Sequence, residues 1–326
     1  GPTLVTQDMI DLGHKVATKT IEQGEPVRTF GQLIGFATEK IEPGEWIHAH
    51  NLSVGELSLD YAFSEDVPPA PEPIHGRTFQ GYRRADGRAA TRNYIGIISS
   101  VNCSATASKF VAESCDEEML ADYPNIDGVI PLMHKGGCAM QYGGEDHHQL
   151  ARVLAGFAKH PNIAAYIILG LGCETGQSDF FIDNYGLTQL EMPGQPAKKE
   201  NNAPLVMNIQ DTGGIAKTVE RAIAALKKLL PEVNHVERVP IPVSELILGT
   251  ECGGSDGNSG VTANPALGIA SDLLVAHGGT TILGETPEIY GGEHLLTRRA
   301  ISREVGEKLI ERIRWWEDYV GKFGVQ

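Results

Sequence analysis

The sequence predicts an α/β protein: a small β-rich module at the N-terminus, followed by a larger α/β body with a mostly parallel sheet. Three observations carry this prediction. Residues 1–66 hold short apolar segments separated by glycine turns, a proline-rich stretch follows, and from about residue 77 strand-like and helix-like segments alternate. Such alternation is typical of a parallel sheet with helices on its faces.

The N-terminal module is predicted from short strands and the turns between them. Gly24, Gly31 and Gly44 mark the turns. Residues 67–76 form a linker with four prolines in six positions, which predicts a stiff, extended domain boundary. The strand candidates are Val16–Thr18, Pro26–Phe30, Leu33–Ala37 and Trp46–His50.

The body, residues 77–326, is predicted to contain two subdomains, at about 77–240 and 241–326. Its last helix places apolar residues at steps of three or four, which predicts a core-facing stripe of Val305, Leu309, Ile313, Trp316 and Val320. The expected strands are 94–101, 164–169, 245–248 and 280–283, and the expected helices are 105–120, 148–159, 214–230, 266–276 and 302–320.

Composition narrows the function classes. The 326 residues carry a formal net charge of −15, which argues against nucleic acid and anionic membranes as partners because both bind basic surfaces. No apolar run reaches membrane-span length, and no signal peptide is recognisable. Five cysteines without a Cys-x-x-Cys pair favour reduced thiols, and hence a cytoplasmic protein.

Four of the five cysteines follow strand-like runs, where each run breaks into a turn. Cys103, Cys138, Cys173 and Cys252 share this placement, whereas Cys115 falls within a predicted helix. Because the carboxyl ends of strands line the ligand crevice of an open α/β sheet, the four thiols predict one site built from four loops. The competing interpretation is that they are small buried packing residues.

A histidine pair suggests a metal site in the N-terminal module. His48 and His50 lie two positions apart on a predicted strand and so share a face. Two imidazoles on one face suit a divalent metal, with Asn51 as an oxygen donor and His14 and Lys15 closing on the same place. Two solvated histidines at a strand end are the alternative.

Two turns of the body combine acid–base groups with thiols. His134, Lys135 and Cys138 supply a base, a cation and a thiol, so His134 is a candidate general base, with a structural or solvated histidine as the alternative. Glu174 follows Cys173 in a glycine-rich turn that lacks dinucleotide-motif spacing. A carboxylate there opposes a bound pyrophosphate, which favours metal or acid–base chemistry.

A further glycine-rich turn follows the strand expected at 245–248. It contains Glu251, Cys252, Ser255 and Asp256, with Asn264 shortly after. The turn has no Gly-Lys-Ser/Thr ending, so it is not a Walker loop, but its amides suit an anion nest. A surface loop without a ligand is the alternative.

The concentrated basic stretch at residues 83–92 contains four arginines and enters the first strand of the body. Arg83 and Arg92, with Asn93 beside them, are candidate ligands of a substrate carboxylate, for which the guanidinium fork is shaped. A solvated hairpin is equally compatible with the pattern.

Together, these segments resemble the altronate/galactarate dehydratase family. The motifs Gly-Leu-Gly-Cys-Glu174 and Glu-Ile-Tyr290-Gly favour the altronate branch over the galactarate branch. The matching segments are 13–17, 44–51, 81–87, 91–93, 170–174, 251–256, 262–268 and 285–290.

The resemblance implies a β-clip (SAF) domain at residues 1–66 and a catalytic body after the linker. It implies dehydration of D-altronate to 2-keto-3-deoxygluconate with a ferrous or manganous ion, with galactarate as the alternative substrate. A small sugar-acid substrate and a homo-oligomer are expected. The family carries further segments at both ends, so the sequence is expected to be truncated relative to it.

Loss of water from an aldonate needs a base at C2, an acid at the C3 hydroxyl and a cation for the carboxylate. In this hypothesis the assignments are His134 as base, Glu174 or Glu251 as acid or metal ligand, His48 and His50 as metal ligands, and Arg83, Arg92 or Lys15 for the carboxylate.

Two other functions remain open from the sequence. The four strand-end cysteines are compatible with an iron–sulfur dehydratase, if their loops converge on one cluster. The β-rich module is compatible with a carbohydrate-binding domain on an inactive scaffold.

Overall fold

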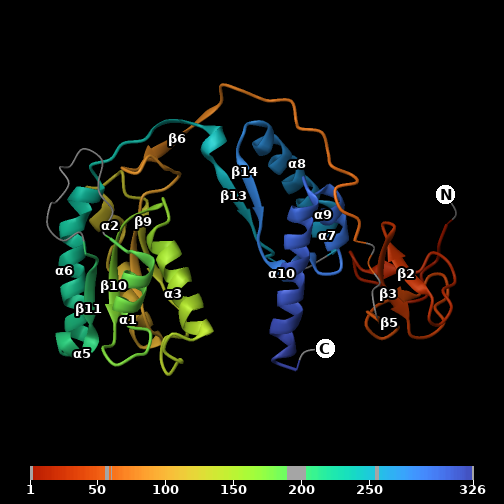
Figure 1. The fold of residues 1–326 in the computed structure, drawn as a ribbon, viewed down its shortest axis with the longest axis horizontal. Coiled ribbons are helices and arrows are strands. Elements are labelled where there is room, and N and C mark those ends of the chain that lie inside the picture. The colour runs from red at the N-terminus through yellow and green to blue at the C-terminus, as the bar shows by residue number, and fades with distance from the viewer. Residues whose placement is uncertain (1–2, 56–58, 60, 189–202, 254–256, 325–326) are drawn as a thin grey trace. The chain divides into compact units, whose positions relative to one another are not determined.

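The computed structural model describes residues 3–55, 59, 61–188, 203–253 and 257–324. The chain forms two compact units (Figure 1): unit 1 combines residues 1–75 with 246–326, and unit 2 contains residues 76–245. The C-terminal segment therefore groups with the N-terminal module and not with the rest of the predicted body.

A four-stranded parallel sheet organises unit 2, in the order β11-β10-β8-β9. All eight residues of β10 are buried, as expected for a central strand covered by helices on both faces. The predicted α/β body with a parallel sheet is thereby confirmed. The strands are β8 (Tyr94–Ser99), β9 (Gly128–Leu132), β10 (Ile163–Gly170) and β11 (Leu205–Asn208).

In the described part of unit 2, the helices beside this sheet are α1 (Asn102–Glu113), α2 (Glu117–Leu120), α3 (Glu145–Ala158), α4 (Ser178–Tyr185), α5 (Ile209–Thr212) and α6 (Ile215–Val233). Alternate residues of β10 face opposite sides because a strand has a side-chain period of two. Ile167 and Leu169 pack with α1 and α6, whereas Tyr166 and Ile168 pack with α3 and α4. The sheet thus forms the middle of three layers, with one hydrophobic core on each of its faces (Figure 1).

The single helix expected at 105–120 is divided in two. The Asp116 side chain accepts a hydrogen bond from Met119 N–H and caps α2, which favours a new helix start at this position. Cys115 therefore lies buried between α1 and α2 instead of within one helix.

A small antiparallel sheet, β12-β6-β7, joins the first and last segments of unit 2. It consists of β6 (Thr78–Arg83), β7 (Ala89–Ala90) and β12 (Val239–Pro242), and a 3-10 turn, η1 (Val243–Glu245), follows β12.

The N-terminal part of unit 1 is strand-rich, as predicted. β2 (Pro26–Thr29), β3 (Gln32–Ala37) and β5 (Leu52–Ser53) form an antiparallel sheet, and β1 (Lys15–Val16) pairs with β4 (Trp46–Ile47). Its core contains Ala17, Ile21, Val27, Ala37, Ile41 and Ile47.

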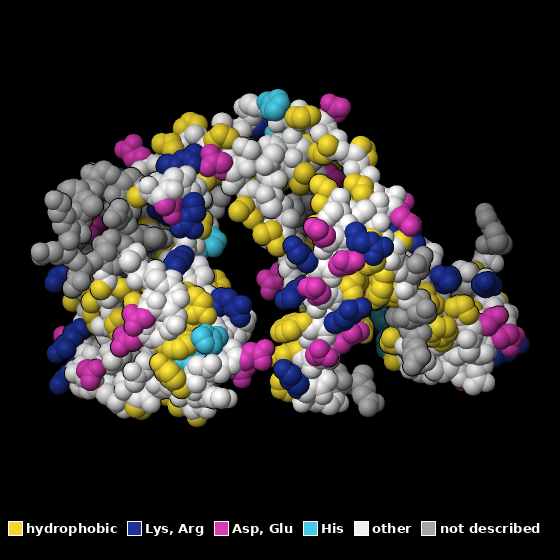
Figure 2. Space-filling view, viewed as in Figure 1, with side chains coloured by type: hydrophobic (Ala, Val, Ile, Leu, Met, Phe, Trp, Pro, Cys, Tyr) yellow, Lys and Arg dark blue, Asp and Glu magenta, His cyan; other side chains and the backbone are white. Residues whose placement is uncertain are grey.

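The C-terminal part of unit 1 contains one parallel strand pair, β13 (Ile247–Thr250) and β14 (Thr280–Leu283). Many apolar side chains of this part are open at the surface (Figure 2); Ile247 is 69% exposed, Ile269 63% and Leu283 62%. The other elements are α7 (Gly257–Val261), α8 (Ala263–Ala276), η2 (Thr286–Ile289), α9 (Glu293–Arg299) and α10 (Arg303–Gly321).

The buried stripe of α10 differs from the predicted one. Gly306, Ile310 and Ile313 are buried, whereas Val305 is 46% exposed, so the prediction for Val305 was wrong. The helix rests on Phe63, whose ring would lie 2.5 Å from a Cβ added at Gly306. Because a glycine allows this close approach, the helix face that carries Gly306 packs toward the core. The predicted apolar stripe did not include this glycine. None of the described helices is long and apolar enough to cross a membrane.

Candidate active site

The carboxyl edge of the parallel sheet in unit 2 gathers polar residues from four loops. Ser100 follows β8, His134 follows β9, Glu174 follows β10 and Gln210 follows β11. From β8 the chain crosses to β9 on one side, whereas β10 lies on the other side. The edge between β8 and β10 is therefore a topological switch point, where open α/β sheets bind ligands.

Close backbone packing fixes these loops to one another. Gly176 N–H donates to Gly137 O at 2.9 Å. Gly137 has a φ of 93°, and a Cβ there would lie 2.5 Å from Ser100 O. Only glycine fits such a position without strain, so the loops after β8, β9 and β10 form one packed cluster.

Glu174 is the buried carboxylate of this edge, at 4% exposed. Its Oε1 accepts from Ser100 Oγ at 2.9 Å and from Leu171 N at 3.0 Å, and its Oε2 accepts from Gly172 N at 2.6 Å. Burial acts to raise the pKa of Glu174, but hydrogen bonds from backbone N–H groups and from Ser100 outweigh burial and lower it. This geometry favours an ionised carboxylate whose role is to hold the loop. It favours that role more than a role as proton donor or as metal ligand.

Gly170, the last residue of β10, leaves room for this polar cluster. A Cβ at position 170 would lie 2.5 Å from Asn208 Oδ1, 2.7 Å from Glu174 Oε1 and 3.0 Å from Ser100 Oγ. The first glycine of the Gly-Leu-Gly-Cys-Glu motif is therefore required by packing around the carboxylate.

Cys173 lies exposed beside Glu174, and Gln210 contacts it. Gln210 Nε2 donates to Cys173 Sγ at 3.3 Å, and Gln210 N–H donates to Leu171 O at 3.0 Å. Gly172 has a φ of 116°, and a Cβ added there would lie 3.0 Å from Gln210 Oε1. The loops after β10 and β11 thus hold the thiol at the surface.

Both ring nitrogens of His134 are engaged with backbone. Its Nε2 lies 2.9 Å from Ser99 O, and its Nδ1 accepts from Gly136 N–H at 3.1 Å. Burial lowers the pKa of His134, with an opposing contribution from the Ser99 contact. The arrangement favours a neutral imidazole that braces the loop after β9, and it leaves no free nitrogen for the general-base role expected from the sequence.

The four strand-end cysteines are all exposed, and Cys115 is buried. Small buried packing residues are therefore the wrong interpretation for those four. Cys103, Cys138 and Cys173 share the carboxyl edge of unit 2, and Lys135 is exposed in the same loop as Cys138. Within the described ranges no three His, Cys, Asp or Glu side chains come together as a metal site. Cys252 belongs to unit 1, and the iron–sulfur alternative stays a prediction.

A second carboxyl edge lies in unit 1, at the ends of β13 and β14. Cys252 N–H donates to Glu285 Oε2 at 2.6 Å, and Glu285 has a φ of 59°. A non-glycine residue in this left-handed region is uncommon and costs conformational energy. Glu251 is exposed beside Cys252. The Glu285 clasp was not predicted from the sequence.

The rest of the expected anion nest is only partly described. Ser255 and Asp256 lie outside the described residues. Residues Gly257–Val261 form helix α7 instead of an open glycine loop. Asn264 lies in the first turn of α8, where its Oδ1 accepts from Ser259 Oγ at 3.2 Å.

The histidines of the N-terminal module lie around Trp46. His48 and His50 belong to a turn after β4 and not to a strand, so the shared-face argument was wrong. Asn51 explains the turn: its Oδ1 accepts from His48 N–H and its Nδ2 donates to Trp46 O. The amide oxygen expected to bind a metal is thereby used within the turn.

The structure brings His14 and His48 together, with ring centroids 5.9 Å apart. His14 Nδ1 accepts from Trp46 Nε1 at 3.1 Å, which leaves its Nε2 for another partner. Lys15 is exposed on β1. Two imidazoles without a third ligand fall short of the usual metal site, and no group of three is present among the described residues. These residues alone therefore do not fit the expected metal.

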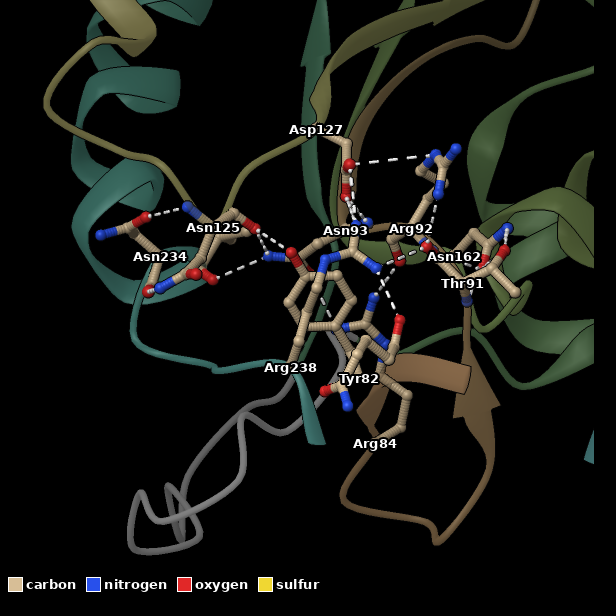
Figure 3. A network of polar contacts seen from close by, with 12 residues as sticks. Tyr82, Arg84, Thr91, Arg92, Asn93, Asn125, Asp127, Asn162, Asn234 and Arg238 are labelled. Atoms are coloured by element: carbon tan, nitrogen blue, oxygen red, sulfur yellow. Dashed lines mark hydrogen bonds and ion pairs between the residues drawn. The ribbon is translucent and has the colours of Figure 1, made fainter. Parts of the chain in front are cut away.

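The basic stretch lies at the opposite edge of the unit 2 sheet. Asn93, Asp127 and Asn162 come directly before β8, β9 and β10, at their amino ends (Figure 3). Asn93 is fully buried, accepts from Arg84 Nη1 and donates to Asn125 O. Its predicted role in substrate binding is therefore wrong, because all its polar atoms serve the fold.

The arginines of this stretch are likewise paired with protein groups. Arg83 makes a bidentate contact with Glu245, at 2.5 and 2.9 Å. Arg92 donates to Thr91 O. Arg84 is 7% exposed, and burial lowers its pKa to about 10. Arg83 and Arg92 lie at or before the amino end of β8 and thus away from the crevice edge, and their role in carboxylate binding stays a prediction.

Several residues of the carboxyl edge were missed by sequence reasoning. Ser100, Asn208, Gln210 and Glu285 carry hydrogen-bonding groups into the two edges. Each ends a strand or lies within two residues of a strand end, and that position was the available signal. Hydroxyl and amide side chains after a strand are too common to single out without the contacts they make.

Three family models match the chain. They are described as "D-galactarate dehydratase/Altronate hydrolase, second domain" over residues 81–234, "D-galactarate/Altronate dehydratase, C-terminal" over residues 243–326, and "Altronate/galactarate dehydratase SAF domain" over residues 1–55. The expected SAF domain at the N-terminus is thereby confirmed.

Curated relatives agree with these models. Altronate dehydratase of Bacillus subtilis (strain 168) is 33% identical over 322 residues, covering 98% of this chain and 61% of the relative. Galactarate dehydratase (L-threo-forming) of Escherichia coli (strain K12) is 35% identical over 316 residues, covering 95% and 59%. The chain spans about three fifths of the length of these two dehydratases.

A third relative carries a different name. The beta subunit of (2R)-sulfolactate sulfo-lyase of Chromohalobacter salexigens is 34% identical over 236 residues, covering 72% of this chain and 53% of the relative.

Proposed function

The chain belongs to the D-galactarate/altronate dehydratase family, and from this membership we propose that it serves a hydro-lyase that eliminates water from a sugar acid. The observation that carries the proposal is the carboxyl edge of unit 2, where exposed Cys173 lies beside ionised, buried Glu174. The Gly-Leu-Gly-Cys-Glu174 motif lies at the carboxyl edge of the sheet, where open α/β sheets generally bind ligands, and this supports the proposal.

The names of the relatives support the reaction class, elimination, more broadly than they support any one substrate. A sulfo-lyase, by its name, removes a sulfur group from sulfolactate, whereas the dehydratases remove water. The common element is a lyase reaction on a hydroxy acid. We propose D-altronate as substrate and 2-keto-3-deoxygluconate as product. Galactarate is the second candidate, because the galactarate and altronate dehydratases are about equally similar to this chain, at 35% and 33% identity.

The reaction needs three functions from side chains. A base removes the proton at C2, an acid assists departure of the C3 hydroxyl, and a cation binds the carboxylate. His134 and Glu174 are engaged with the backbone and hold the loops, so we propose positioning roles for both. We assign proton transfer to the exposed thiols of Cys173 and Cys138, and carboxylate binding to Lys135.

In unit 1, catalytic roles for Glu251 and Cys252 stay predictions, and Glu285 holds their loop by the Cys252 amide. A ferrous or manganous ion stays a prediction, and the assignments above use side chains alone.

The proposal is tested with a panel of sugar acids that includes D-altronate and galactarate, with and without Fe²⁺ or Mn²⁺. The readout is keto-acid formation. In deuterated water the product is expected to carry deuterium at C3, because the enol formed after loss of water is protonated there. Absence of C3 deuterium in a turned-over product contradicts the elimination mechanism, and a clear preference for galactarate overturns the substrate assignment alone.

Side-chain roles are separated by matched variants. Cys173→Ser is expected to lower kcat about 100-fold, the scale of one acid–base group, and Lys135→Ala to raise KM. Cys115→Ser is the control, because this thiol is buried between α1 and α2, away from the edge. Equal activity of all three variants removes the edge of unit 2 from the proposal.

A further inference from the structure

His147 is a buried histidine with one ring nitrogen that lacks a partner. It lies in the first turn of α3, at 1% exposed. Its Nδ1 accepts from Gly143 N–H at 3.0 Å, so Nε2 carries the proton in the neutral ring. That N–H is buried and has no acceptor among the described residues. A buried unpaired donor costs free energy and needs an explanation.

Aromatic rings surround this imidazole. The Phe180 ring stacks on it, with centroids 3.8 Å apart and an interplanar angle of 22°. The Tyr142 ring lies 5.4 Å from both His147 and Phe180. Tyr142 is 72% exposed and belongs to the loop before α3, so one ring near the imidazole is a surface side chain.

The imidazole lies among the loops of the candidate site. α3 and α4 follow β9 and β10, so their first turns, which carry His147 and Phe180, lie at the carboxyl edge. The hydrogen bond from Gly176 N–H to Gly137 O ties together the loops that precede these helices. The unpaired donor thus belongs to the loop cluster that holds Cys138 and Cys173.

Burial, and then the neighbouring His148, lower the pKa of His147, so the ring is neutral near pH 7. A single neutral donor between aromatic rings does not compensate the burial of a carboxylate charge. A hydroxyl oxygen, with the C–H groups beside it, is chemically matched to an N–H and apolar ring faces.

We propose that His147 Nε2–H binds a hydroxyl oxygen of the sugar acid, in a subsite with Phe180 as its floor and Tyr142 as its cover. The subsite rests on the proposed function, and it adds His147 to the candidate substrate-binding residues. Tyr142 has to move aside for the hydroxyl to enter, because the imidazole is covered in this structure.

The test compares His147→Phe, which keeps the ring stack and removes the N–H, with His147→Gln, which restores an amide donor. For D-altronate, His147→Phe is expected to raise KM about tenfold with kcat nearly unchanged, since one neutral hydrogen bond is lost from substrate and transition state alike. His147→Gln is expected to recover part of this loss. His148→Phe is the control, because His148 also contacts Phe180 but is exposed.

A second readout does not depend on turnover. With ¹⁵N-labelled histidine, the Nε2–H signal of His147 is expected to shift when D-altronate is titrated in, and the His148 signal to stay unchanged. An unchanged KM in His147→Phe together with an unmoved His147 signal overturns the subsite. If His147→Phe fails to fold, His147→Gln and the wild-type titration decide.

The two proposals fail in distinguishable ways. A shifted His147 signal without turnover of any sugar acid supports the subsite and contradicts the dehydratase function. Turnover with an unmoved signal and unchanged KM supports the function and removes His147 from substrate binding. A shift in both histidines indicates a general change in α3 and also contradicts the subsite.

Discussion

Strands β10 and β13 each end in a cysteine-bearing turn at the carboxyl edge of their own parallel sheet, but the surroundings of the two strands differ. In unit 2, β10 pairs with β8 and β11, and all its residues are buried under helices on both faces. In unit 1, β13 pairs only with β14 among the described strands, and no residue of β13 is buried. The same local signal therefore leads to two different structural outcomes.

The difference is visible in the carboxylates that accompany the thiols. Glu174, after β10, is 4% exposed and accepts hydrogen bonds on both oxygens. Glu251, after β13, is exposed beside Cys252, whose amide is held by Glu285. Covered sheets fix the loops at their edge, because neighbouring strands and helices supply partners from several directions. At the edge of β13, the contact seen among the described residues is the Glu285 clasp on the Cys252 amide.

Backbone protection is expected to show the largest contrast. Amides of β10 are expected to exchange hydrogen at least about 100-fold more slowly than those of β13, because buried central strands open only with larger unfolding events. Hydrogen exchange followed by mass spectrometry of the full chain measures both. Similar protection of the two strands means that unit 1 is covered in solution by something the structure does not include.

Removal of the carboxylates is the next contrast. Glu174→Ala leaves the amides of Leu171 and Gly172 and the Ser100 hydroxyl without their acceptor, at an expected cost of about 2–4 kcal/mol. Glu251→Ala is expected to change stability by less than about 0.5 kcal/mol, as for other exposed sites. Urea unfolding is the measurement.

Each unit has its own probe for this experiment. The three tryptophans lie at positions 46, 315 and 316, all in unit 1. Tryptophan fluorescence follows unit 1, and alkylation of buried Cys115 follows unit 2. Glu174→Ala is expected to lower the midpoint measured by Cys115 and to leave the fluorescence midpoint nearly unchanged. Equal shifts in both probes contradict separate stabilities of the two units.

Two strand glycines give a closely matched pair of substitutions. Gly170→Ala in β10 places a Cβ 2.5 Å from Asn208 Oδ1 and is expected to cost about 1–3 kcal/mol. Gly249→Ala in β13 meets nothing within 4 Å, so alanine is expected to be neutral or slightly stabilising there. A tolerated Gly170→Ala shows that the Glu174 cluster adapts, and it weakens the positioning role of that carboxylate.

The dependence of stability on acid pH, through the ionisation of Glu174, is expected to be the smallest of these effects. The pKa of Glu174 is lower in the folded chain than its ordinary value of 4.5. Its contribution to stability is therefore complete above pH 4.5 and is lost as the pH falls through the folded pKa. The Cys115 midpoint in urea, measured between pH 6 and 3, is expected to fall more steeply in wild type than in Glu174→Gln. Parallel profiles contradict the role of hydrogen bonding in lowering this pKa.

Much of the carboxyl edge of unit 2 was predictable. A buried-type strand that ends in a glycine turn fixes where the next residues lie, so Cys103, Cys138, Cys173 and Glu174 were placed correctly at strand ends. The same reasoning applied fully would have excluded Arg92 from this edge, because it precedes β8 and so lies at the amino edge. Arg92 is close to β8 in sequence, but it lies at the end of that strand opposite the candidate site.

Other features depended on contacts that no local pattern carries. His48 and His50 were expected on one strand face, but the Asn51 side chain turns the chain after Ile47. His134 was expected to be a free base, and its two nitrogens are occupied by Ser99 and Gly136. Such roles depend on which polar group meets which, and residue type alone does not determine this.

The sequence by itself determined the succession of strands and helices, the strand-rich module and the turns at which thiols occur, because these follow from periodicity over a few neighbouring residues. The tertiary structure decided which charges are buried, which histidines are free and which edge is covered. Ser100 and Glu174 are 74 positions apart, and Asn93 and Val233 are 140 apart. Their hydrogen bonds form only when the sheet brings these segments together, and they fix the state of each polar side chain.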